Sequence, residues 1–275
     1  MGSSGGAREP EASKRREYSD VGRAPYELRQ FGGGGGRFRV YPSVVFSFAL
    51  VSPPASEAEL LGRARSLAGH PLGAIAERHA VPLADVSRSK GWIGKLLEIS
   101  LGATASSRGE PDFQLLGVEL KTVPVDLEGR PKESTFVCSA PLETMGELSW
   151  ERSPVREKLA RVLWVPIEAT PEVPVPYRRI GMPLLWSPSP EEEVTLKRDW
   201  DELSERVGKG HVEEITAHIG CHLQLRPKGA NARSARWGVN EEGDPIRTLP
   251  RAFYLRASFV REVLARGYAP SGRSP

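Results

Sequence analysis

Residues 111–123 read PDFQLLGVELKTV, and no other stretch says as much about the architecture of this chain. Apolar Val118 and Leu120 alternate with charged Glu119 and Lys121, which is the period of a β-strand. Side chains two positions apart in a strand point to the same face of its sheet. The sequence therefore predicts that Glu119 and Lys121 project together.

Asp112 lies in the loop before this strand and can fold back beside Glu119. Two carboxylates and the backbone carbonyl of Leu120 would form an oxygen-only site suited to Mg²⁺. The ammonium of Lys121 would offset charge that develops on a phosphodiester, while the metal activates water. The pattern is short, and its alternative interpretation is a surface strand with an ion pair between positions i and i+2.

The flanking sequence predicts helices before the strand and a mixture of strands and helices after it. Capping residues and apolar spacing favour helices over 56–67, 72–78 and 92–101, one that opens at Ser189, and one from Ser258 to a stop at Gly267. Further strands are expected at 135–140, 162–167, 221–226 and 252–256. This order indicates an α/β or α+β protein with a mixed central sheet flanked by helices.

Composition sets broader limits on the class of protein. The chain has 275 residues, of which 39% are hydrophobic and 27% charged, so it can build a core and is no disordered polyelectrolyte. It has no apolar run of about 18 residues, and we expect no membrane association. Cys138 and Cys221 are too few for a disulfide framework, which favours a reducing, cytoplasmic location.

The chain divides by composition into three parts. Residues 1–43 contain the glycine run 32–36, and we expect a disordered extension. Residues 44–268 form the expected folded domain, and residues 269–275 a flexible tail. From Cys221 onward, ten Lys or Arg residues face four Asp or Glu residues, which suggests a surface for a polyanion at this end.

Longer motifs carry a resemblance to a known family. They read KGWIGKLLEISLGA at 90–103, RVLWVP at 161–166, PLLWSP at 183–188, LRPK at 225–228 and LPRAFYL at 249–255. With residues 111–123, in this order, the chain resembles the MutH family of methyl-directed mismatch-repair endonucleases over about residues 52–267. The resemblance implies a restriction-endonuclease-like fold whose two lobes form a DNA cleft.

It also implies an activity and partners. The expected reaction is a Mg²⁺-dependent nick, with Mn²⁺ as a substitute, 5′ to the G of GATC on the unmethylated strand of hemimethylated duplex DNA. The expected activator is MutL, acting after MutS has found a mismatch, and the expected state is a monomer.

Residue roles follow from the same resemblance. Asp112 and Glu119 match the metal-binding carboxylates and Lys121 the catalytic lysine. Glu98 matches a helical glutamate that completes the acidic cluster, and Lys158 matches a further active-site lysine. For Lys158 the alternative is a solvated helix face that it would share with Arg156 and Arg161.

For DNA reading, Arg226, Pro227 and Lys228 match the recognition loop; Arg suits bidentate contacts to guanine. Tyr254 matches the tyrosine that senses the methyl state of adenine. Lys90 and Phe136 match further DNA-contacting positions. The alternative for the two aromatic residues is a place in the core.

Two other functions stay open on the sequence alone. One is a free-standing GATC-specific restriction endonuclease that cuts both strands without MutL. The other is a catalytically inactive DNA-binding repair protein, although the presence of Asp112, Glu119 and Lys121 argues against it.

Overall fold

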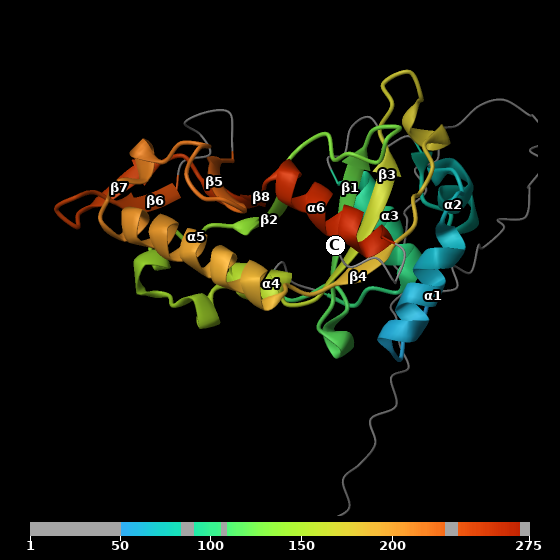
Figure 1. Ribbon diagram of the computed structural model, residues 1–275, viewed down its shortest axis with the longest axis horizontal. Helices are drawn as coiled ribbons and strands as arrows, with labels where there is room; N and C mark the ends of the chain where they lie inside the picture. Colours follow the sequence, from blue (N-terminus) through green and yellow to red (C-terminus); the bar gives the residue numbers. More distant parts are fainter. Residues whose placement is uncertain (1–50, 84–90, 106–108, 229–235, 270–275) are drawn as a thin grey trace, which may run out of the picture. The chain divides into compact units, whose positions relative to one another are not determined.

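The computed structural model describes residues 51–83, 91–105, 109–228 and 236–269, all of which belong to one compact unit, Ser47–Pro275 (Figure 1). The expected N-terminal extension, residues 1–43, lies outside the described residues, as do Lys90 and the tail 270–275. Within the described ranges no helix is long and apolar enough to cross a membrane.

Most of the expected helices form where the apolar spacing places them. The described α-helices are α1 (Glu57–Leu67), α2 (Leu72–Arg78), α3 (Trp92–Leu101), α4 (Pro154–Leu159), α5 (Pro190–Gly208) and α6 (Ala257–Tyr268). The predicted bounds of α2 and α3 are confirmed, and α5 opens with the predicted Ser189 cap, whose hydroxyl accepts from the Glu192 N–H. Short 3-10 turns connect them, among them η2 (Gln114–Leu116), η3 (Met145–Glu147), η4 (Trp150–Arg152), η5 (Val175–Tyr177) and η6 (Val212–Glu214).

The last helix corrects one prediction. Gly267 does not stop α6, which begins at Ala257 and continues to Tyr268. The glycine serves packing instead, because a Cβ at this position would collide with the Leu184 side chain.

The strands are divided among small sheets. They are β1 (Glu119–Val125), β2 (Thr135–Ser139), β3 (Val162–Glu168), β4 (Leu184–Trp186), β5 (Leu223–Pro227), β6 (Arg236–Val239), β7 (Pro245–Thr248) and β8 (Arg251–Leu255). The first sheet, β1-β3-β4, is the mixed one: β1 runs parallel to β3, and β4 antiparallel to it. The second, β2-β8-β5, is antiparallel, and β6 pairs with β7 alone. The protein is therefore α+β, as predicted.

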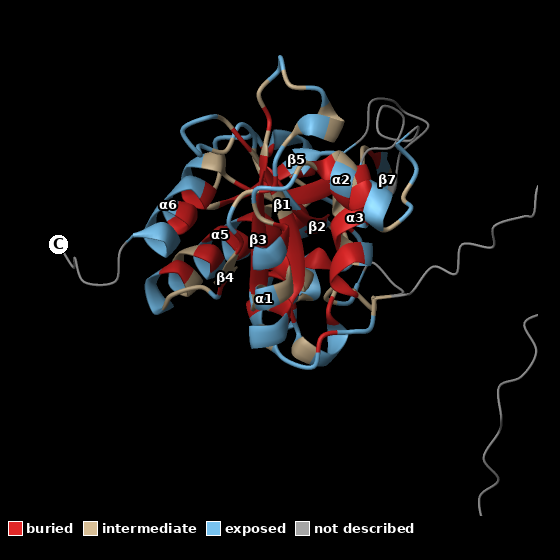
Figure 2. Cartoon of the chain, turned by 90° about the vertical axis from the view of Figure 1, so that its right-hand side faces the viewer, coloured by how far each residue is buried: buried red, intermediate tan, exposed pale blue. Residues whose placement is uncertain are grey.

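Two hydrophobic clusters cover the opposite faces of the first sheet. Leu163 and Val165 of β3 join α1, α2 and α3 in one cluster, and Figure 1 shows these helices gathered beside β1 and β3. Val162 and Trp164 join α4, α5, α6 and the second sheet in the other. This burial on both faces makes β3 a nearly continuous apolar strand (Figure 2).

The alternation also fixes the direction of the charged residues of β1. Leu120 belongs to the cluster with α1–α3, whereas Val123 and Val125 belong to the cluster with the second sheet. Glu119 and Lys121 share the parity of Val123, so they project toward the second sheet.

Candidate active site and nucleic-acid interface

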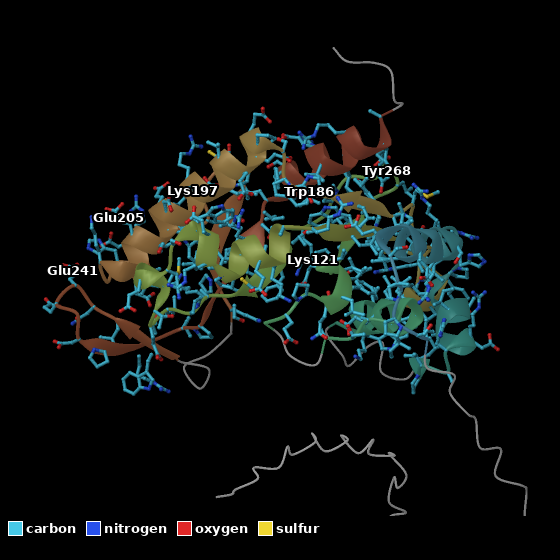
Figure 3. All side chains as sticks on the ribbon, turned by 90° about the horizontal axis from the view of Figure 1, so that it is seen from below. Lys121, Trp186, Lys197, Glu205, Glu241 and Tyr268 are labelled. Atoms are coloured by element: carbon cyan, nitrogen blue, oxygen red, sulfur yellow. The ribbon has the colours of Figure 1, made fainter. Side chains whose placement is uncertain are left out.

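Glu119 and Lys121 form a buried ion pair on one face of β1. The Lys121 Nζ lies 2.8 Å from Glu119 Oε1, and the two residues are 8% and 5% exposed. The predicted common direction is confirmed, and the alternative of a surface strand is wrong. Figure 3 shows Lys121 inside the protein, whereas Lys197 and Glu205 project from it. Because burying charges is costly, both members of this ion pair need further hydrogen-bond or charge partners.

A bulge in β2 supplies one of these partners. The pairing of β2 with β8 shifts between Phe136 and Cys138, which leaves Val137 as the extra residue. The Val137 carbonyl accepts a hydrogen bond of 3.1 Å from Lys121 Nζ. The ammonium thus joins the two sheets. Cys138 is buried in the core as predicted, and burial raises the pKa of its thiol to about 12.

Lys158 occupies the other side of Glu119. Its Nζ lies 2.9 Å from Glu119 Oε2 and also donates to the Glu110 carbonyl in the loop that leads to Asp112. The lysine is only 5% exposed, so the solvated-face alternative is wrong for it. Lys158 lies on α4, whereas Arg161 follows this helix and pairs with Glu57. Glu119 is therefore held between two ammonium groups.

Asp112 folds back onto the start of β1, as predicted. Its Oδ2 accepts the Leu120 N–H at 2.8 Å. Burial is the largest cause that raises the pKa of this carboxyl, to about 6, and the negative charges of Glu119 and Glu98 act in the same direction. The hydrogen bond from Leu120 opposes this shift. Burial and the neighbouring negative charges therefore disfavour the ionised form of Asp112, and a bound cation would stabilise that form.

Glu98 lies on the rim of this acidic group. It is carried by α3, which ends at Gly102 in the left-handed conformation. Its side chain is one-third exposed and pairs with Lys95 at 3.1 Å. The charge of Glu98 is one of the smaller causes of the raised pKa of Asp112, and the place of Glu98 in a metal-binding acidic cluster stays a prediction.

The donor chemistry of Asp112 and Glu119 fits a hard divalent cation. Carboxylate oxygens are the ligands that Mg²⁺ prefers, and a cation would relieve the disfavoured charge on Asp112. Both Glu119 oxygens are engaged by lysines, however, and Glu98, Asp112 and Glu119 do not form a tight group of three ligand atoms. Among the described residues, only His211, Glu214 and Glu241 place three ligand atoms within 4.8 Å of one another, elsewhere on the surface. The metal role of Asp112, Glu119 and the Leu120 carbonyl stays a prediction.

The predicted DNA-reading residues meet on the second sheet. Phe136 of β2 is paired with Tyr254 of β8, and their rings pack edge to face at 5.6 Å. The Arg226 guanidinium lies 5.5 Å from the Tyr254 ring, and Lys228 Nζ lies 4.2 Å from the Phe136 ring. Cations over aromatic faces are stabilised by the ring electrons.

The core alternatives for the two aromatic residues are wrong. Phe136 is 37% exposed, and Tyr254 is half-buried, whereas its neighbour Phe253 is fully buried. Pro227 ends β5 between Arg226 and Lys228.

One hollow of about 660 Å³ contains members of both groups. Glu98, Lys121, Phe136, Lys228 and Tyr254 all line it. Some residues of the carboxylate–lysine group and some of the aromatic–cation group thus line the same hollow.

The structure adds residues that the sequence did not single out. Ser134 accepts from Arg226 at 2.6 Å, and Ser139 accepts from Lys228 at 3.1 Å. Glu133 and Gly94 line the hollow. These contacts depend on how distant strands align, and no local signal marks them.

The fold is that of the restriction-endonuclease-like α+β class. A family model for the DNA mismatch repair enzyme MutH matches residues 101–199. The proteins named DNA mismatch repair protein MutH from Salmonella typhimurium, Salmonella typhi and Salmonella newport are each 54% identical over 220 residues, covering 80% of this chain and 95% of theirs. The chain therefore belongs to the MutH family of DNA mismatch repair enzymes.

Proposed function

We propose that this protein is the strand-selective endonuclease of mismatch repair, which nicks DNA 5′ to the G of GATC on the unmethylated strand of hemimethylated sites. The observation that carries the proposal is that Lys121 and Glu98 line one hollow together with Phe136, Lys228 and Tyr254. A phosphodiester there would meet the hydrolytic group and the reading group together.

Asp112, Glu119 and the Leu120 carbonyl would hold Mg²⁺, for which Mn²⁺ is a plausible substitute. When bound, the metal would supply a more acidic water and polarise the phosphoryl oxygen.

The lysines divide the remaining work. Lys121 faces the hollow and would neutralise negative charge that develops on the phosphorus oxygens. Lys158 is buried and contacts both Glu119 and the loop of Asp112, so it would hold these carboxylates in place. Glu98 would complete the acidic cluster at the rim.

The second sheet would read the site. Arg226 presents a planar fork that suits guanine O6 and N7, and Lys228 suits a phosphate or a base edge. Tyr254 would lie against the adenine edge, where an N6-methyl group replaces an amino hydrogen. Phe136 would support this ring through their edge-to-face contact. Lys90, which lies outside the described residues, would add a further DNA contact.

The proposed setting is a cytoplasmic monomer that acts on duplex DNA and is activated by MutL after MutS has bound a mismatch. Membership in a mismatch-repair family supports the DNA and repair-pathway part of this setting.

A nicking assay on plasmid DNA tests the proposal. The substrates carry unmethylated, hemimethylated or fully methylated GATC, with Mg²⁺ present and with or without MutL and ATP. We expect MutL-stimulated nicks on unmethylated strands only. Double-strand cuts without MutL would favour a free-standing restriction enzyme, and binding without cleavage an inactive DNA-binding protein.

A further inference from the structure

The turn that precedes β5 is held by a buried carboxylate from another element. Asp199 of α5 is 1% exposed, whereas Lys197 and Glu205 of the same helix project from the protein (Figure 3). Its Oδ2 accepts the N–H of His222 at 2.6 Å and of Leu223 at 2.9 Å, and its Oδ1 accepts the N–H of Cys221 at 2.8 Å. Three successive backbone donors therefore converge on one side chain.

This arrangement satisfies the charge of Asp199. Among the described residues, no Lys, Arg or His lies within ion-pair distance of it. Successive N–H groups form a concavity that stabilises an anion, and hydrogen bonds to a charged acceptor are among the stronger ones. The burial of the Asp199 charge thus requires the conformation of residues 221–223, and Asp199 in turn stabilises that conformation.

An arginine holds the carbonyl side of the same turn. Arg256 Nε donates to the Gly220 carbonyl at 3.0 Å, and its Nη2 donates to the Ala217 carbonyl at 2.8 Å. Gly220 adopts φ +83°, and a Cβ there would collide with the Leu223 carbonyl. The backbone of 217–223 is therefore fixed from both sides in a conformation that only glycine accommodates at its centre.

Both DNA-reading strands begin or end at this turn. Leu223 is the first residue of β5, and Arg226 follows three positions later. Arg256 comes two positions after Tyr254 of β8, and its N–H donates to the His222 carbonyl. A shift of the turn would therefore move Arg226 and Tyr254 relative to each other.

We infer that Asp199 and Arg256 are positioning residues for sequence recognition: they set the placement of Arg226 and Tyr254 without contacting DNA. The inference rests on the proposed function. Recognition of a base requires a side chain to be held within a fraction of an ångström, whereas non-specific attraction to phosphates does not.

The test compares Asp199→Asn with Ser204→Ala, a second buried polar position on α5. Ser204 donates to the Met145 carbonyl at 2.7 Å and makes no side-chain hydrogen bond to residues 217–223. The measurements are binding to a GATC duplex and to a scrambled duplex, Mn²⁺ affinity, and amide hydrogen exchange at 221–223. Asp199→Asn should weaken GATC binding by about tenfold or more, leave scrambled-duplex binding and Mn²⁺ affinity unchanged, and speed exchange at 221–223. Ser204→Ala should change neither the exchange nor the selectivity.

Arg256→Met provides a second route if Asp199→Asn does not fold. It removes the carbonyl contacts at a half-buried position and should give the same selective loss. Selectivity equal to that of the unmodified protein in a folded variant, or an equal loss on both duplexes, would overturn the inference. Absence of any GATC preference in the unmodified protein would overturn the proposed function, and the inference with it.

Discussion

A substitution of Lys121 should affect nicking much more than DNA binding. Lys121 is buried, lines the hollow and is bonded to Glu119 and Val137, so its ammonium is fixed before any substrate arrives. Lys121→Ala should retain GATC binding within a few-fold and lose nicking by at least about a hundredfold, because charge on the phosphorane is no longer offset. Gel-shift and single-turnover nicking assays measure the two effects. Lys197→Ala, at an exposed lysine, is the control; preserved nicking by Lys121→Ala would remove Lys121 from the mechanism.

Asp112 should make stability and metal binding depend on pH. Its folded-state pKa of about 6 lies above the ordinary value of 3.8, so the folded protein binds this proton more tightly than the unfolded chain does. The resulting stability is fully present below about pH 4 and is lost as the pH rises through 6. Without metal, Asp112→Asn should therefore raise the melting temperature at pH 7.5 and have little effect at pH 4.

The same group should couple protons to the metal. Below pH 6, Mg²⁺ must displace the Asp112 proton, so the apparent affinity should fall by up to about tenfold per pH unit. Above pH 6 the apparent Mg²⁺ affinity should become independent of pH. Calorimetric titration across pH 5–8 measures this, with Asp112→Ala as the variant that should not bind. Equal Mg²⁺ affinity of the variant and the unmodified protein would show that the metal site is elsewhere.

Tyr254 should control methyl discrimination more than rate. Tyr254→Ala removes the ring between Phe136 and Arg226, so the preference for hemimethylated over fully methylated DNA should fall by about tenfold or more. Cleavage of both substrates at several enzyme concentrations gives this ratio. Tyr177→Ala, at an exposed tyrosine of η5, is the matched control. An unchanged ratio in Tyr254→Ala would contradict the assignment.

At the scale of elements, the end of α3, the helix that carries Glu98, can be tested for how strongly its conformation is constrained. Gly102 has φ +81°, and a Cβ there would lie 2.5 Å from the Ser52 carbonyl oxygen. Gly102→Ala should therefore destabilise the protein by more than about 1 kcal/mol. Gly62→Ala is the control within α1, where a Cβ meets nothing within 4 Å, and it should stabilise by about 0.5–1 kcal/mol. Urea unfolding measures both; a neutral Gly102→Ala would show that this helix end is not constrained.

Local signals explain which elements could be predicted. Apolar spacing and the glycine at position 102 defined α3, and capping residues defined the start of α5. The helix end predicted at Gly267 was wrong because a glycine can either end a helix or allow close packing, and the sequence does not show which role it has. The bulge at Val137 could not be predicted, since it arises from pairing with β8 more than a hundred residues later.

At the scale of the whole molecule, the site combines residues that are far apart in the chain. The grouping of Asp112, Glu119 and Lys121 follows from strand geometry and could be predicted. The second ammonium on Glu119 comes from Lys158, 39 positions away, and the contact of Arg226 with Ser134 spans 92 positions. Such contacts depend on how distant elements pack, α4 against β1 and β5 beside the start of β2, so only the family resemblance marked Lys158 beforehand.

The most direct test of the central claim is to map the cut on a synthetic duplex with one hemimethylated GATC. Each strand carries its own end label, and Mg²⁺, MutL and ATP are present. The proposed function predicts one product, cut 5′ to the G on the unmethylated strand, and none with Lys121→Ala. Cuts in both strands, or at another position of the unmethylated strand, would contradict it.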